Sequence, residues 1–166
     1  MNKLEPQSSA GWLRIKSAGQ DFGLAIEGVH SVFRVVALTR APLAPSWVLG
    51  LTNLRSIVLP VVCLARRLNP AESPRGVGAL ALVTGLGPDD FALSIDEVGD
   101  IIGADHANFT QTPNRSDFAN SALTVGEVRT QTMLFPILDI NAIFPVNKWV
   151  EPANNYDDVI ASIKRA

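Results

Sequence analysis

The apolar residues of this chain mostly alternate with polar ones, which is the period of a β-strand rather than that of a helix. Two alternating segments near the N-terminus, 12–16 and 22–26, flank a short polar turn at 18–21. The same arrangement recurs at 80–95, around a second turn. Each of these two regions is therefore predicted to form a β-hairpin.

Similar alternation predicts five further short strands, at 32–38, 57–62, 98–102, 123–128 and 133–138. Many short strands at this spacing favour small β-barrels over a parallel sheet flanked by helices. Short helices are expected at 64–68 and 139–144, directly after two of the strands. Asp139 can cap the second of these helices, whereas Cys63 at the matching position cannot cap the first.

The C-terminal segment 151–166 predicts an amphipathic helix. Asn155 is a good N-cap, and Lys164 and Arg165 lie in the last turn, where they complement the helix dipole. The apolar stripe of this helix consists of Tyr156, Val159, Ile160 and Ile163. Because a helix this short is marginal in isolation, the stripe is expected to pack on its own chain or, alternatively, on a partner.

The chain also repeats itself once, with the same order of blocks in both halves. The repeated blocks pair 22–29 with 91–98, Gly50 with Gly126, and 59–64 with 135–140. A long repeat of this kind usually means one folding unit used twice. We therefore expect two small, similar β-barrels in tandem.

The expected boundaries follow from the repeat and from composition. The segment 1–10 is predicted to be a disordered tail, 11–68 the first barrel, 69–78 a linker rich in Pro, Ser and Gly, and 79–146 the second barrel. Each half alone is near the lower size limit for independent folding. The two barrels are therefore expected to share a hydrophobic interface.

Charge and cysteine content narrow the class of protein. The 166 residues carry a formal charge of −2, which lacks the basic footprint of a nucleic-acid binder. No apolar run approaches the length of a membrane span, and the polar segment 1–10 does not resemble a signal peptide. Cys63 is the single cysteine and cannot form an internal disulfide, so we expect a cytoplasmic protein that does not insert into the membrane.

No catalytic or metal-binding pattern is visible in the sequence. His30, His106 and Cys63 lack the spacing of metal ligands. With two histidines and no nucleophile-elbow motif, the sequence does not indicate a hydrolase. Gly85 and Gly87 lie where a hairpin reverses, and no Lys-Ser or Lys-Thr follows them as in a phosphate-binding loop. We therefore expect a protein that is not an enzyme and that binds no cofactor.

The two copies differ most at Asn53, Leu54 and Arg55, which have no counterpart in the second copy although the flanking apolar positions agree. Arginine is well suited to anchor an interface, because its planar fork makes several hydrogen bonds while its stem packs on apolar surface. The alternative is that Arg55 forms a salt bridge within its own barrel. The run 29–36 also holds more apolar side chains than one strand face can bury, so part of it is expected to face the other barrel or a partner.

Taken together, these blocks resemble the CheW family of chemotaxis coupling proteins. The similar blocks are 22–29, 39–42, 50–64, 92–98 and 134–140, within a match from about Trp12 to Phe144. The resemblance implies two intertwined, five-stranded SH3-like barrels without catalytic activity. It also implies a scaffold that joins the cytoplasmic tips of methyl-accepting chemoreceptors to the regulatory domain of a CheA-type histidine kinase, at membrane-associated receptor arrays.

In this family the receptor tip lies in the groove between the barrels, near the matching arginine, and the kinase docks on barrel surfaces. Carried over to matching positions, the predicted receptor-side residues are Val29, Asn53, Leu54, Arg55 and Ser56. Further candidates for partner binding, without an assigned contact, are Val32, Phe33, Asp96, Glu97 and Val98.

The chain departs from the family pattern at three positions. Ser56 replaces a glycine, Cys63 replaces a frequent aspartate, and Ser31 replaces a common acidic residue. Such departures suggest a less typical array, for example one that controls type IV pili. Two other classes stay open: a small barrel that binds a ligand or nucleic acid, and an enzyme with a groove that holds Arg55 beside Asp96. The acidic charge and the lack of interleaved basic and aromatic residues weigh against nucleic-acid binding.

Overall fold

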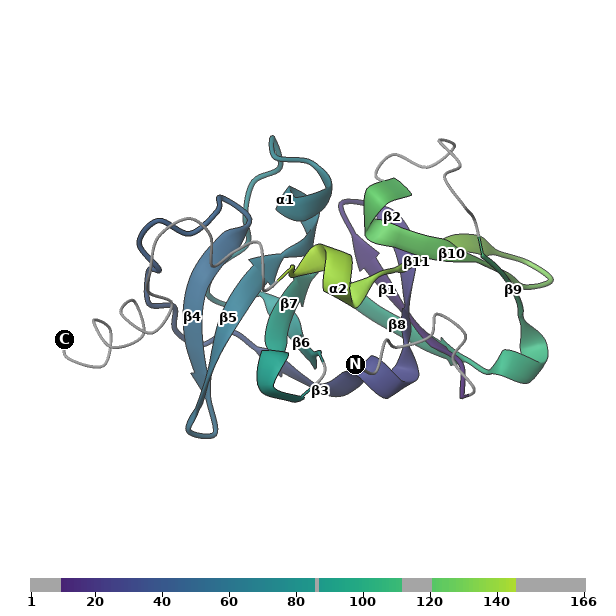
Figure 1. The fold of residues 1–166 in the computed structure, drawn as a ribbon, viewed down its shortest axis with the longest axis horizontal. Helices are drawn as coiled ribbons and strands as arrows, with labels where there is room; N and C mark the ends of the chain where they lie inside the picture. Colours follow the sequence, from purple (N-terminus) through teal and green to yellow (C-terminus); the bar gives the residue numbers. More distant parts are fainter. Residues whose placement is uncertain (1–9, 86, 112–120, 146–166) are drawn as a thin grey trace.

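The computed structural model describes residues 10–85, 87–111 and 121–145 (Figure 1). The predicted helix at 151–166 and nearly all of the predicted tail 1–10 lie outside these residues. The described strands are β1 (Trp12–Ser17), β2 (Gln20–Ala25), β3 (Val29–Arg34), β4 (Val48–Leu54), β5 (Ile57–Cys63), β6 (Leu80–Thr84), β7 (Phe91–Ile95), β8 (Glu97–Ile102), β9 (Asn108–Gln111), β10 (Thr124–Arg129) and β11 (Leu134–Leu138). The described helical segments are α1 (Leu64–Leu68), α2 (Ile140–Ile143) and the short 3₁₀ turns η1 (Ile26–Gly28), η2 (Gly87–Asp89), η3 (Ala104–His106) and η4 (Ser121–Leu123).

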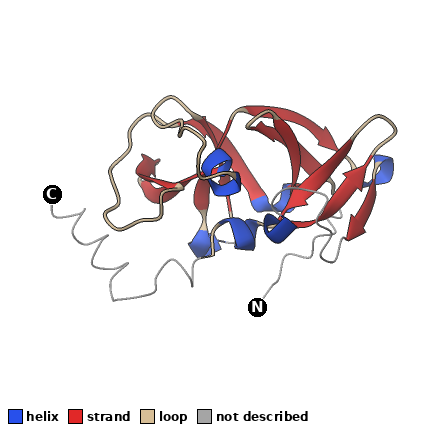
Figure 2. Cartoon of the chain, turned by 90° about the horizontal axis from the view of Figure 1, so that it is seen from above, coloured by secondary structure: helices blue, strands red, loops and turns tan. Residues whose placement is uncertain are grey.

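The strands form two sheets that lie side by side, with short helical pieces between strands (Figure 2). One sheet has six strands in the order β8-β1-β2-β11-β10-β9, and the other has five in the order β3-β6-β7-β5-β4. Each sheet contains one parallel pair of strands, β2 with β11 in the first and β5 with β7 in the second. The predicted fold class, all-β with short helices and two similar barrels, is confirmed, although one sheet has six strands instead of five.

Each barrel is completed by a hairpin from the other half of the sequence. The hairpin β1–β2 pairs with β8 and β11, whereas the hairpin β6–β7 pairs with β3 and β5. In Figure 1 the purple strands β1 and β2 accordingly lie among the green strands of the C-terminal half. The segments 11–68 and 79–146 therefore each contribute strands to both sheets.

The five-stranded sheet closes on itself through backbone hydrogen bonds. Beyond β3, the N–H of Thr39 donates to the carbonyl of Leu51 at 2.8 Å, and the N–H of Leu51 donates back at 2.7 Å. This approach requires Gly50, because a Cβ there would lie 2.4 Å from the carbonyl oxygen of Thr39. The repeated Gly126 meets the same constraint, since its Cβ would lie 2.5 Å from the carbonyl oxygen of Thr110. The repeated glycine thus marks where two backbones approach closely.

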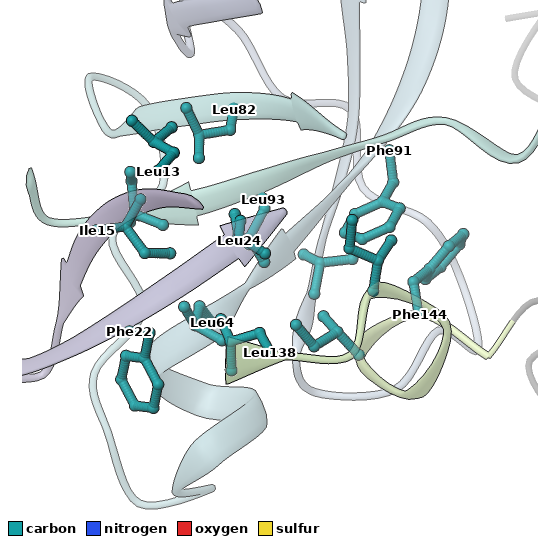
Figure 3. Packing of buried hydrophobic residues seen from close by; sticks show 14 residues of the cluster. Leu13, Ile15, Phe22, Leu24, Leu64, Leu82, Phe91, Leu93, Leu138 and Phe144 are labelled. Carbon is teal, nitrogen blue, oxygen red and sulfur yellow. The ribbon is translucent and has the colours of Figure 1, made fainter. Parts of the chain in front are cut away.

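The largest hydrophobic cluster lies between the two sheets (Figure 3). It combines residues from β1, β2, β5, β6, β7, β11 and both α-helices: Leu13, Ile15, Phe22, Leu24, Val62, Leu64, Leu82, Phe91, Leu93, Ile95, Leu138, Ile140, Ile143 and Phe144. Each sheet also has a smaller cluster of its own, around Val35, Leu59 and Val61 in one and around Trp12, Val128 and Phe135 in the other. The barrels therefore share the hydrophobic interface that their small size predicted.

Most predicted elements lie within a residue or two of the observed ones. The strand predicted at 32–38 is the main exception, because β3 begins at Val29 and ends at Arg34. Two strands, β4 and β9, were not predicted at all. Gly50 interrupts the alternation in β4, and β9 consists mostly of polar residues, so neither segment shows a clear strand pattern.

The two α-helices begin as their sequences predict. Asp139 caps α2, since its carboxylate oxygen Oδ1 accepts hydrogen bonds from the N–H groups of Asn141 at 3.0 Å and Ala142 at 3.3 Å. Cys63 occupies the same position before α1 and makes no side-chain capping bond. Its side chain is buried instead, with 2% of its surface exposed.

Candidate partner-binding surfaces

Arg55 and Ser56 form the two-residue turn of the hairpin β4–β5. The strands stay in register up to the pair of Leu54 and Ile57, so only these two residues are left to reverse the chain. Both have positive φ, +50° at Arg55 and +70° at Ser56. Positive φ at both positions is the mark of the type I′ turn, whose twist matches that of the flanking strands.

The turn places two side chains in a backbone region that residues with a Cβ disfavour. At the other two-residue hairpin turn, between β1 and β2, Ala18 has a φ of +50° but glycine follows it at +75°. At the β4–β5 tip the second position is Ser56. Here the side-chain oxygen Oδ1 of Asn53 accepts a hydrogen bond from the N–H of Ser56 at 3.0 Å, which stabilises the turn.

The side chain of Arg55 is exposed and makes no hydrogen bond or ion pair with any described residue. Its neighbours include two exposed apolar residues, Ile57 at 62% and Val58 at 43%. Leu54 is partly buried and packs against the cluster inside the five-stranded barrel. We call residues 53–58 the hairpin-tip surface. It offers an unpaired cation beside apolar area, on a hairpin held by the barrel core.

The apolar run of β3 divides between two environments. Its residues alternate, so that Val29 and Phe33 are partly buried while Val32 is 49% exposed. Val29 packs on the cluster between the sheets, and Phe33 packs on the cluster inside the five-stranded barrel. Phe33 and Leu54 therefore contact the same cluster, which connects β3 to the base of the hairpin tip.

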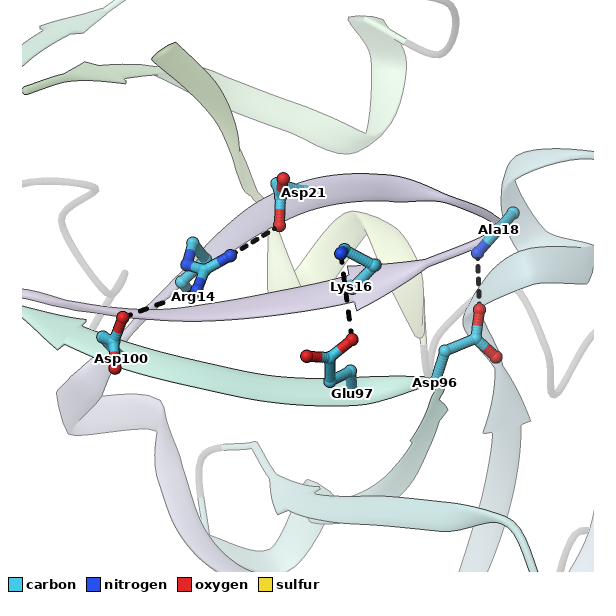
Figure 4. Close-up of polar contacts among 7 residues, drawn as sticks. All are labelled: Arg14, Lys16, Ala18, Asp21, Asp96, Glu97 and Asp100. Carbon is cyan, nitrogen blue, oxygen red and sulfur yellow. Dashed lines mark hydrogen bonds and ion pairs between the residues drawn. The ribbon is translucent and has the colours of Figure 1, made fainter. Parts of the chain in front are cut away.

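The block Asp96, Glu97 and Val98 lies where the chain crosses from one sheet to the other (Figure 4). Asp96 accepts a hydrogen bond at Oδ2 from the N–H of Ala18 at 2.8 Å, and its Oδ1 lies 3.5 Å from Nε of Arg75. Asp96 thus ties the β1–β2 turn to the chain before β6.

The other two residues of this block also contact their own chain. Glu97 lies 3.8 Å from the ammonium group of Lys16; the Glu97 side chain is exposed and that of Lys16 is partly buried. Val98 pairs with Ile15 of β1 and packs, like Val29, on the cluster between the sheets. Arg55 lies in the β4–β5 turn and Asp96 in the crossover from β7 to β8, and no hydrogen bond or ion pair joins them among the described residues.

A second charged group lies on the same sheet. Arg14 donates from Nη1 to Asp21 at 3.0 Å, and its Nη2 lies 3.4 Å from a carboxylate oxygen of Asp100 (Figure 4). The bond to Asp21 is the main cause of a raised pKa of the Arg14 guanidinium. These contacts join β1 to β2 and β8, and they leave Arg14 engaged rather than free for a partner.

Sequence reasoning missed part of these surfaces. Ile57 and Val58 belong to the strand predicted at 57–62, and their apolar side chains suggest burial. Both are exposed in the structure, because the first residues after the turn lie beyond the barrel interior. Arg75 was assigned only to a linker, and its proximity to Asp96 depends on a contact between distant segments. The turn signal at Asn53 was available, because Asn at the start of a turn often bonds the backbone nearby.

The described residues were also compared with the requirements of a metal site and of a membrane span. They contain no group of three or more His, Cys, Asp and Glu side chains arranged to hold a metal ion. Within the same residues, no helix has the length and apolar character needed to cross a bilayer. His30 lies 3.5 Å from Asp90, an arrangement that fits a surface contact at the end of the β3–β6 pair.

Comparison with known proteins supplies the family. The family model of the CheW-like domain matches residues 11–148, which covers most of the chain and includes both barrels. The chain belongs to the CheW-like family. Among curated relatives, the chemotaxis protein CheW of Rhizobium meliloti is 28% identical over 127 residues, which is 76% of this chain and 81% of the relative. CheW of Treponema pallidum is 25% identical over 137 residues, or 80% of this chain and 81% of the relative.

A solved structure of a CheW protein has the same fold. The scaffolding protein TtCheW from Thermoanaerobacter tengcongensis superposes with a TM-score of 0.72, at 22% sequence identity, over 84% of this chain and 94% of that chain. The two SH3-like barrels of this chain thus share the fold of that CheW protein. The family assignment agrees with the resemblance found in the sequence.

Proposed function

We propose that this CheW-family chain is a non-catalytic adaptor that couples the cytoplasmic tips of chemoreceptors to the regulatory domain of a CheA-type histidine kinase. Family membership supports the adaptor class. The observation that carries the receptor side is the hairpin-tip surface, where Arg55 is exposed and has no partner among the described residues. An unpaired arginine on a rigid hairpin is suited to anchor another protein.

On the receptor side, Arg55 would donate hydrogen bonds to acceptor groups of the partner. Ile57 and Val58 would bury their exposed apolar side chains against the same partner. Asn53, Leu54 and Ser56 shape the turn, and Val29 contributes from β3. Because polar and apolar contributions combine, micromolar affinity, about −8 kcal/mol, is within reach of such a surface. Val32 and Phe33 on β3, and Asp96, Glu97 and Val98 at the crossover, are further candidates for contact with either partner.

The proposed mechanism is positional. An adaptor that holds receptor and kinase at once raises the effective concentration of one at the other, so individual contacts need not be strong. Such an adaptor works in the cytoplasm, at receptor arrays on the membrane. Since Ser31 and Ser56 depart from the usual residues, we include a less typical pathway, such as control of type IV pili, in the proposal.

The test is calorimetric binding of the chain to a receptor-tip fragment and, separately, to the kinase regulatory domain from the same cell. Arg55→Ala should weaken receptor binding by about tenfold or more. It should leave the unfolding midpoint unchanged, because this side chain is exposed and makes no hydrogen bond or ion pair with a described residue. Arg40→Ala is the matched control, since Arg40 is also exposed and lies beside Gly50 rather than at the tip. Equal receptor affinity in both variants, or no binding of the wild-type chain to either partner, would overturn the proposal.

A further inference from the structure

The β4–β5 tip holds two successive side-chain-bearing residues at positive φ. Other non-glycine residues at positive φ, Ala18 and Leu43, occur singly. Backbone strain of this kind persists only where surrounding structure holds it, and it gathers at functional sites. The tip therefore needs a local group that favours the turn over competing conformations.

Asn53 supplies that group. Its Oδ1 accepts the hydrogen bond from the N–H of Ser56 at 3.0 Å, across the turn from the strand end. The equivalent hairpin of the other barrel, β10–β11, is held in a related way, because Oγ1 of Thr130 accepts from the N–H groups of Thr132 at 3.3 Å and Met133 at 3.0 Å. In both barrels a side-chain oxygen near the start of the hairpin tip accepts hydrogen bonds from backbone N–H groups two or three residues later.

We propose that Asn53 is a positioning residue, which acts on the partner only through Arg55 by holding the turn that projects it. This inference rests on the proposed receptor-binding function of the tip. The side-chain hydrogen bond described in the turn joins Asn53 to Ser56, and Asn53 is itself exposed with its acceptor oxygen already engaged. Serine at position 56, where the backbone favours glycine, makes the tip depend on this one bond.

The kinetic consequence separates positioning from direct contact. If Asn53 raises the fraction of molecules whose tip adopts the binding-competent turn, its removal lowers that fraction. The apparent affinity then falls in proportion to the fraction that remains competent. The association rate should then fall while the dissociation rate of the bound complex stays nearly the same. Loss of a direct contact raises the dissociation rate instead, as most interface substitutions do.

The experiment uses the full chain and a receptor-tip fragment in surface plasmon resonance, with amide hydrogen exchange of the free protein alongside. Asn53→Ala removes the acceptor and Asn53→Asp keeps it. Asn53→Ala combined with Ser56→Gly removes the acceptor and also the backbone strain at position 56. Asn69→Ala is the matched control, because Asn69 accepts a comparable bond from the N–H of Ala71 at 3.1 Å at the end of α1.

We expect Asn53→Ala to lower the association rate about fivefold, the effect of one ordinary hydrogen bond, and to speed exchange of the Ser56 amide by a similar factor. Asn53→Asp should bind like the wild-type chain, the added Ser56→Gly should restore association, and Asn69→Ala should change neither rate. A raised dissociation rate in Asn53→Ala, or no rescue by Ser56→Gly, would overturn the positioning role. Absence of any wild-type binding would overturn the proposed function instead, while Ser56 exchange in the free protein would still decide whether Asn53 holds the turn.

Discussion

Arg67 joins the two α-helices, and its replacement offers the sharpest test of how the barrels are held together. Its Nε donates to the carbonyl of Ile143 and its Nη2 to that of Ala142, both at 3.0 Å. The guanidinium carbon also lies 5.0 Å from the centre of the Trp47 ring. Arg67 of α1 therefore binds the last carbonyls of α2, although it precedes Ile143 by 76 positions in the chain.

The expected cost of Arg67→Ala follows from these contacts. A hydrogen bond that involves a charged group contributes about 1.5–3 kcal/mol, and a cation–π contact at a half-buried site about 1 kcal/mol. Burial disfavours the charged guanidinium and lowers the pKa of Arg67, so part of this gain is lost to desolvation. If the cation–π contact roughly offsets desolvation, two bonds at the lower figure leave a loss of about 3 kcal/mol.

The assay is urea and thermal unfolding followed by circular dichroism. For a chain of this size, 1 kcal/mol shifts the melting temperature by about 2–4 °C, so Arg67→Ala should melt about 9 °C lower. Arg67→Lys keeps the charge but loses the fork and should fall about halfway between. Arg40→Ala, an exposed arginine without a described contact, should melt like the wild-type chain. A loss below about 1 kcal/mol in Arg67→Ala would show that water replaces these bonds at little cost, and the reasoning would fail.

Three further outcomes test other parts of the fold. Asp139→Ala removes the cap of α2 and should lower the free energy of unfolding by about 1 kcal/mol in urea titrations, whereas an unchanged midpoint would mean that the cap is dispensable. Gly126→Ala places a Cβ against the carbonyl oxygen of Thr110 and should cost about 1–3 kcal/mol, so a variant as stable as wild type would contradict the close approach. Cys63, 2% exposed, should react with a thiol reagent only on unfolding; fast labelling of the native chain would refute its burial.

Much of the fold could be predicted from the order of short apolar segments and the turns between them. Burial alternates clearly along β3, whereas β7 is buried along its whole length and most of β5, β6 and β11 is buried on both faces. The helix caps followed from single residues, as Asp139 shows. The family followed from the order of blocks rather than from any one motif. These features are local, or are repeated, and so they are visible in the sequence.

The exchange of hairpins between the barrels is different, since it depends on pairing between distant strands. The alternation in β1 predicts that one face of the strand is buried. It does not predict whether β8 or a strand closer in the sequence pairs with β1. The candidate site was limited in the same way. When Gly50 is aligned with Gly126, Asn53 corresponds to Arg129 in the second copy. The side chain that holds the second hairpin tip is that of Thr130 instead. Residue type locates a turn, but the hydrogen bond that holds it depends on register.

The exchanged hairpins also set the order in which the chain can assemble as it leaves the ribosome. The five-stranded barrel requires nothing beyond β7, so it can close once Ile95 has emerged. The six-stranded barrel begins with the first strand made, yet β2 must wait for β11, which ends at Leu138. During that interval the apolar side chains of β1 and β2 lack most of their final neighbours, and such exposed surface favours aggregation. The hairpin β1–β2 is therefore made before the strands of its own barrel, and the nascent protein most needs protection from aggregation between the synthesis of β2 and that of β11.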